Sequence, residues 1–137
     1  CAFDLWLSLF NNTTGASNSA FGYRTLRNNT TGSSNTAFGY QCLYYNTTGT
    51  QNTAVGFNSL LDNIASNNHA FGHSALQYNT TGTGNSAFGL SALKFNTIGE
   101  SNSAFGQSAL QSNTTGKQNS AFGWQALVYN TVGQNNS

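Results

Sequence analysis

Asn18-Ser19-Ala20-Phe21-Gly22 is the stretch that decides the fold, because it recurs almost unchanged along the chain. Its first residue returns six times, at Asn35, Asn52, Asn68, Asn85, Asn102 and Asn119. The step from Asn18 to Asn35 is 17 residues, as are all the others except that from Asn52 to Asn68, which is 16. A fixed period of this length indicates that the fold is built by stacking one small unit.

The repeated unit has the pattern N-S/T-A-F-G-x-x-small-L-x-x-N-T-T-G-x-x, and we number its positions 1 to 17 from the first Asn. Phe at position 4 is replaced once, by Val55. We predict three sets of core ladders, formed by the columns at positions 1, 4 and 9: Asn18, Asn35, Asn52, Asn68, Asn85, Asn102 and Asn119; Phe21, Phe38, Phe71, Phe88, Phe105 and Phe122; Leu26, Leu43, Leu60, Leu76, Leu93, Leu110 and Leu127.

This repeat predicts an all-β fold, a β-solenoid of about eight 17-residue coils. A helical repeat needs about 33 residues or more, and Asn, Thr and Gly are poor helix formers. Stacked coils would place identical residues about 4.8 Å apart, so that each buried Asn could hydrogen-bond to the Asn above and below it. The sequence leaves open whether Phe points into the core of one chain or into a seam between chains.

The repeats divide the chain into three parts. Residues 1–17 form a degenerate repeat, which we interpret as a cap or docking segment; residues 18–135 hold seven repeats; residues 136–137 begin a further repeat. The apolar side chains of the first part are candidate assembly residues that could cover the open coil of another copy: Leu5, Trp6, Leu7, Leu9 and Phe10.

Composition argues against several functional classes. The net charge is +1 and only 5% of residues are charged, which is too few basic residues to neutralise phosphates, so we expect no nucleic-acid partner. No apolar run has the length of a membrane span. The acids Asp4, Asp62 and Glu100 lie far apart, and His69 and His73 have no evident third ligand. We therefore expect no enzymatic activity, no cofactor and no metal.

Glycosylation is suggested by a recurring Asn-x-Thr acceptor pattern. The candidate sites are Asn12, Asn29, Asn46, Asn79 and Asn113, with overlapping patterns at Asn11 and Asn28. The alternative is that Asn-Thr-Thr-Gly is only a turn and that its Asn side chains point inward.

Extra aromatic residues at positions 6 and 11 could stack on the sugar rings of a glycan. The candidates for glycan stacking are Tyr23, Tyr40, Trp124 and Tyr129. The alternative is that these side chains are scattered over the surface, or form a partly covered outer face.

The units N-T-A-F-G-Y-Q-C-L-Y-Y-N-T-T-G (35–49) and N-S-A-F-G-x-S-A-L (85–93 and 102–110) resemble the repeats of phage tail-fibre-like and bacterial surface fibre proteins. They are also distantly similar to the head repeats of trimeric autotransporter adhesins. The resemblance covers residues 18–135. It implies a trimeric or otherwise self-associating β-solenoid exposed outside the cell or on a virion.

Three functions are compatible with these features. The leading hypothesis is a structural protein of an extracellular filament that self-assembles as a homo-oligomer, either a trimer or a head-to-tail filament, and that could carry glycans. The second is an adhesin or tail-fibre module that binds surface glycans. The third is an ice-binding β-solenoid, since regular Thr ladders with few charges have the required composition.

Overall fold

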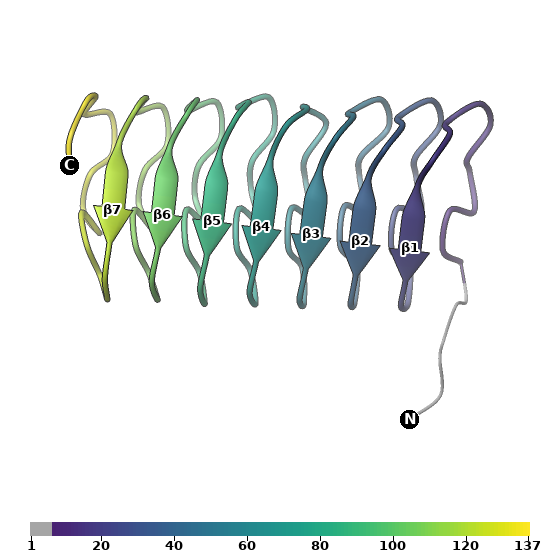
Figure 1. The fold of residues 1–137 in the computed structure, drawn as a ribbon, viewed down its shortest axis with the longest axis horizontal. Helices are drawn as coiled ribbons and strands as arrows, with labels where there is room; N and C mark the ends of the chain where they lie inside the picture. Colours follow the sequence, from purple (N-terminus) through teal and green to yellow (C-terminus); the bar gives the residue numbers. More distant parts are fainter. Residues whose placement is uncertain (1–6) are drawn as a thin grey trace.

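The computed structural model describes residues 7–137, and seven short strands within them form one parallel sheet (Figure 1). The predicted assembly residues Leu5 and Trp6 lie outside the described residues. The strands are β1 (Ser19–Phe21), β2 (Thr36–Phe38), β3 (Thr53–Val55), β4 (His69–Phe71), β5 (Ser86–Phe88), β6 (Ser103–Phe105) and β7 (Ser120–Phe122). Each strand pairs in register with the same positions of the next repeat, as Ala20 does with Ala37.

The predicted class is confirmed: the protein is all-β, a parallel β-solenoid whose coils are about 17 residues apart. In Figure 1 the strands run downward on the near side while successive coils advance to the left, so the solenoid winds left-handed. The prediction of about eight coils was slightly too high, because the seven described strands are joined by six turns of the solenoid. Residues 7–17 pair with the next coil, for example from Leu9 N to Thr25 O at 3.1 Å, but they form no strand.

Each strand is only three residues long because Gly at position 5 ends it. Gly39 has φ +136°, a left-handed conformation that residues with a Cβ rarely adopt. A Cβ at this position would also overlap the carbonyl oxygen of Gly56 in the next coil. The Gly column therefore makes a tight corner along one edge of the solenoid.

The apolar side chains of the core are small or medium in size, and buried polar residues lie among them, including Thr25 and Ser59. Ala at position 3, the small residue at position 8 and Leu at position 9 are buried in all the inner coils, with Leu43, Leu60, Leu76 and Leu93 fully inaccessible. These Leu residues have positive φ, for example +52° at Leu43 and +50° at Leu93. Such a conformation costs on the order of 1 kcal/mol or more, and burying the Leu side chain, worth about 1.5–3 kcal/mol, offsets that cost.

The predicted place of Phe in the core was wrong. Within the single chain, Phe21, Phe38 and Phe122 are 46%, 53% and 70% exposed. Side chains alternate between the two faces of a strand, and Ala at position 3 already points inward. The Phe next to it must therefore point outward, as must the residue at position 2, which is Ser or Thr except for His69.

The 16-residue repeat keeps the strand register despite its missing residue. Thr53 pairs with His69, so β3 and β4 remain aligned. The shortening is absorbed in the turn of residues 63–67, which lies outside the strands.

Replacing Leu93 by Ala should lower the free energy of unfolding by about 2–5 kcal/mol, because a cavity would remain in the core. Leu90 lies in the same coil and is 45% exposed, so Leu90→Ala should change the stability by only about 0.5 kcal/mol. Urea unfolding followed by circular dichroism measures both values. Equal losses for the two variants would contradict this assignment of the core.

Candidate functional site

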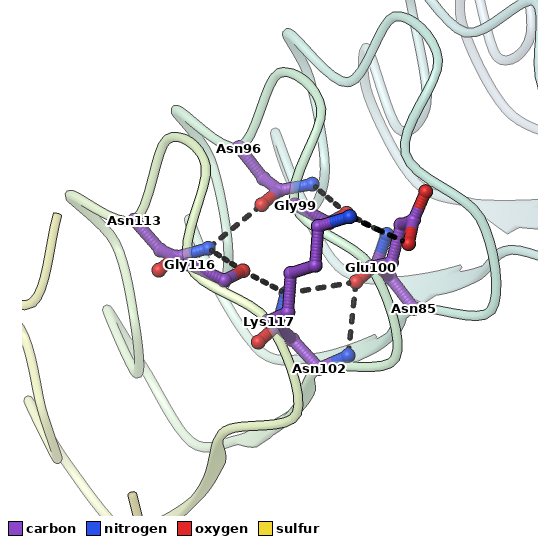
Figure 2. A network of polar contacts seen from close by, with 8 residues as sticks. All are labelled: Asn85, Asn96, Gly99, Glu100, Asn102, Asn113, Gly116 and Lys117. Carbon is purple, nitrogen blue, oxygen red and sulfur yellow. Dashed lines mark hydrogen bonds and ion pairs between the residues drawn. The ribbon is translucent and has the colours of Figure 1, made fainter. Parts of the chain in front are cut away.

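A ladder of asparagine amides runs along the interior of the solenoid at position 12 of the repeats, and Figure 2 shows Asn96 and Asn113 as two of its members. Asn96 Nδ2 donates to Asn79 Oδ1 at 2.8 Å, and Asn113 Nδ2 donates to Asn96 Oδ1 at 2.8 Å. The asparagines at position 1 form a second column, in which Asn102 donates to Asn85 Oδ1 from its backbone N at 3.0 Å and from Nδ2 at 3.1 Å. These buried amides are thus satisfied by their counterparts in adjacent coils.

The two Asn columns meet at the carbonyl group of Gly at position 15. Gly99 O accepts from Asn96 Nδ2 at 3.0 Å and from Asn85 Nδ2 at 2.8 Å, and Gly116 O accepts in the same way from Asn113 and Asn102 (Figure 2). A Cβ at Gly99 would overlap Asn96 Oδ1. Gly is therefore required here because no space remains between the backbone and the amides.

The short repeat interrupts the ladder at position 12. Asn63 Nδ2 keeps the bond within its own turn, to Ala65 O at 2.8 Å, but the bond to the previous coil is lost, and Asn46 Oδ1, although fully buried, has no hydrogen-bond partner. Asn68 Nδ2 crosses between the columns to Asn63 Oδ1 at 3.1 Å. An unsatisfied buried acceptor costs about 1–3 kcal/mol, so this coil is a local weak point in the core.

The burial of this column rules against the predicted glycosylation sites in the folded chain. Asn29, Asn46, Asn79 and Asn113 are fully buried, and Asn12 Nδ2 donates to Gly15 O at 2.9 Å. A glycan attached to Nδ2 would replace a donor of the ladder and would need space that the interior lacks. In the structure the Asn side chains of the Asn-Thr-Thr-Gly turns therefore point inward, as the alternative interpretation expected. Among the acceptor patterns, Asn11 is exposed, and Asn12 and Asn28 are half-buried.

The outer face of the sheet carries a ladder of Phe rings. Centroids of Phe71 and Phe88 and of Phe88 and Phe105 lie 4.7 Å apart, and those of Phe105 and Phe122 lie 5.0 Å apart. The last three rings are nearly parallel, with interplanar angles of 6° and 4°. Val55 separates this run from Phe21 and Phe38, whose centroids are 5.8 Å apart.

A second aromatic ladder lies at position 6, on the other side of the Gly corner. It runs through Tyr23, Tyr40, Phe57 and His73, with successive centroids at 5.4, 4.9 and 5.0 Å. The position 6 ladder therefore spans the coils of β1 to β4, while the unbroken Phe ladder spans those of β4 to β7. The two ladders together line the Gly corner along all seven strands.

The candidate glycan-stacking residues fall into two groups. Tyr40 is stacked on both faces, by Tyr23 and Phe57, and Arg24 lies 4.9 Å from the centroid of the Tyr23 ring. Their ring faces are therefore occupied by neighbours. Trp124 and Tyr129 are 69% and 88% exposed and belong to different columns of the last repeat. The structure does not bring the four candidates together.

The described candidate assembly residues do not form one surface. Leu9 packs against the core, whereas Phe10 is 63% exposed and lies under the Arg27 guanidinium, 5.8 Å from its ring centroid. Leu7 is half-buried and has φ +66°.

The threonine hydroxyls at position 13 are used within the solenoid. Thr30 Oγ1 donates to Thr47 O at 3.0 Å, and the same carbonyl accepts the backbone N–H groups of Thr30, Thr31 and Gly32 at 2.9, 3.1 and 3.3 Å. The same hydroxyl bond recurs at Thr80, Thr97 and Thr114. One row of each Thr pair is therefore not free to order water, which weakens the ice-binding hypothesis.

Ionisable groups are sparse and dispersed. Lys117 Nζ lies 2.9 Å from Glu100 Oε2 in the adjacent coil (Figure 2), and burial raises the pKa of the Asp62 carboxyl. His73 Nδ1 lies 2.9 Å from Ser74 Oγ. Among residues 7–137, no cluster of three His, Cys, Asp or Glu side chains could hold a metal ion. The same residues contain no helix long and apolar enough to cross a membrane.

Comparison with known proteins adds no relative: no family model, curated protein or solved structure matches this chain.

Replacing Asn96 by Leu should lower the free energy of unfolding by about 1–3 kcal/mol, because Asn79 Oδ1 would lose its donor inside the core. Asn28→Leu is the matched control, since the Asn28 side chain is only half-buried and its Oδ1 accepts from the exposed Asn11 Nδ2 at 3.0 Å. Its effect should remain within about 0.5 kcal/mol. Urea midpoints compare the two variants, and an Asn96→Leu protein as stable as the wild type would contradict the role of the ladder.

The Cys42 thiol should be unreactive in the folded protein. Burial raises its pKa to about 12, and Sγ donates to Gly56 O at 2.8 Å. Since the thiolate is the reactive form, a Cys1→Ser variant should not react with a thiol reagent at pH 8 until urea unfolds it. The slow rate at which the reagent labels Cys42 in the folded protein should rise about tenfold for each unit by which pH increases toward that pKa. Rapid labelling of the folded variant at pH 8 would contradict this environment.

Proposed function

We propose that this chain is a non-enzymatic structural module of an extracellular fibre. The observation that carries the proposal is the translational regularity of the solenoid. Each coil is bonded to the next by the same strand register and, outside the short repeat, by the same Asn bonds. A repeat array of this kind gains stability through contacts between neighbouring coils, which suits an extended load-bearing or spacing element.

The distribution of chemical groups supports the same proposal. The most regularly placed polar side chains, the two Asn columns, are engaged in the interior with one another and with Gly carbonyl groups. The six described Lys, Arg, Asp and Glu residues are spread over several coils: Arg24, Arg27, Asp62, Lys94, Glu100 and Lys117. A catalytic site requires acids, bases or nucleophiles within hydrogen-bond reach of a reacting group, and this dispersal favours a structural role.

A glycan-binding module is the second candidate, and the exposure of two aromatic side chains favours it. Trp124 and Tyr129 present free surface in the last repeat, and aromatic rings with an apolar face and a polar tip suit contacts that are partly wet. A glycan array probed with the purified chain, and with a Trp124→Ala/Tyr129→Ala variant, separates this candidate from a purely structural role. Binding that the double variant loses would favour the module.

Cryo-electron microscopy of natively purified material tests the structural proposal directly. We expect filaments with rungs about 4.8 Å apart and with no additional density at the buried Asn29, Asn46, Asn79 and Asn113. Peptide mass spectrometry of the same material should find these four residues unmodified. Short monodisperse particles that never associate would contradict the fibre role.

A further inference from the structure

The outer face of the sheet carries an apolar row at position 4, Phe in six repeats and Val55 in one, beside a polar row at position 2, which is Ser or Thr except for His69. Positions 2 to 6 of the seven repeats contain no Lys, Arg, Asp or Glu. All six such residues in the described part of the chain lie at positions 7 to 16: Arg24 and Arg27, Asp62, Lys94, Glu100 and Lys117. A surface that excludes charge and concentrates aromatic rings has the composition of the centre of a protein interface.

The area of this face is large for a monomer. Phe21, Phe38, Phe71 and Phe122 are 46%, 53%, 37% and 70% exposed, and Phe88 and Phe105 are half-buried. At 150–250 Å² for each Phe side chain, the six rings together present on the order of 500 Å². This value is in the range of the largest apolar patches found on monomers, about 300–600 Å², and such patches often have a function. The outward row at position 2, which is Ser or Thr except for His69, widens the face beyond the Phe rings, toward the roughly 800 Å² per partner of a standard interface.

The geometry of the rings favours a protein partner over a sugar. Phe88 is stacked between Phe71 and Phe105 at 4.7 Å on each side, so its ring faces are covered and only ring edges point outward. Sugar rings stack on aromatic faces, whereas ring edges pack against other apolar side chains and aromatic rings.

The repeat distance selects the partner. The rings are spaced by the rise of one coil, and contacts along the whole face require a partner whose side chains recur at the same spacing. A second copy of this chain has that spacing because its sequence and its fold are the same. Two such faces can interdigitate as a dry zipper.

We infer that the Phe face, defined by Phe21, Phe38, Val55, Phe71, Phe88, Phe105 and Phe122, is a lateral interface at which a second copy of this chain packs side by side with the first. This inference deepens the proposed fibre function by naming the partner and the surface that join neighbouring solenoids. It also explains why Phe recurs at a position that the core of a single chain does not use.

Analytical ultracentrifugation of the full chain tests the interface. At about 100 μM, where an interface of micromolar Kd is saturated, the wild-type chain should sediment as an oligomer and the Phe88→Ser/Phe105→Ser variant as a single copy. Tyr78→Ser/Phe95→Ser is the matched control, because these rings are also stacked, at 5.6 Å, and are 37% and 43% exposed on another column. The control should keep the wild-type oligomer, and circular dichroism should show that both variants are folded.

Cross-linking gives a second readout that does not depend on removing several rings. In a Cys1→Ser background, Phe105→Cys should form covalent dimers with a short bismaleimide, whereas Phe95→Cys should remain monomeric.

A wild-type chain that sediments as a single copy, or an oligomer that survives Phe88→Ser/Phe105→Ser, would overturn the inference. If the Phe88→Ser/Phe105→Ser chain still assembles into filaments, this interface is wrong and the fibre function stands. If the wild-type chain forms an oligomer that needs the Phe rings but forms no filaments, the interface stands and the fibre function is wrong.

Discussion

The rest of the structure depends on the hydrogen bonds that buried asparagine amides make to Gly carbonyl groups and to the asparagines of adjacent coils. Asn96 contacts Gly99 within its own turn and Asn79 in the coil before it. Each such amide therefore closes a turn and joins two coils at the same time. Because a buried amide without partners is costly, coils that stack in any other register would be strongly disfavoured.

This network lets a narrow solenoid hold together with a small apolar core. Ala and Leu are its recurring buried apolar side chains, and the Leu residues are held at positive φ. In-register amide hydrogen bonds recur in both Asn columns, and their favourable free energy helps to offset the conformational cost of the strained turns. The short repeat shows what a break in the pattern does, since one missing residue leaves Asn46 Oδ1 unpaired. The strands tolerate the deletion because the turn alone absorbs it.

The same constraint organises the surface. With Ala turned inward, the side chains at positions 2 and 4 must face outward, and the period of the Asn ladder sets the spacing of the Phe rings at 4.7–5.0 Å between β4 and β7. The Gly corner brings the position 6 column beside the Phe face. Interior polar bonding and exterior aromatic stacking are thus two consequences of one repeat.

The sequence by itself determined the class of fold, the approximate period and the strand register, because a 17-residue repeat of Asn and Gly turns leaves few ways of stacking. It also contained a signal for the orientation of Phe: Ala20 and its equivalents are invariant, whereas Phe is replaced at Val55. Only the tertiary structure decided that Ala rather than Phe fills the interior, and that the acceptor asparagines are buried. Size and hydrophobicity favour Phe for a core, but the side chain that faces inward at that strand is Ala, which is buried in the inner coils. Which side of a three-residue strand faces inward depends on the path of the whole coil, and no local pattern specifies that path.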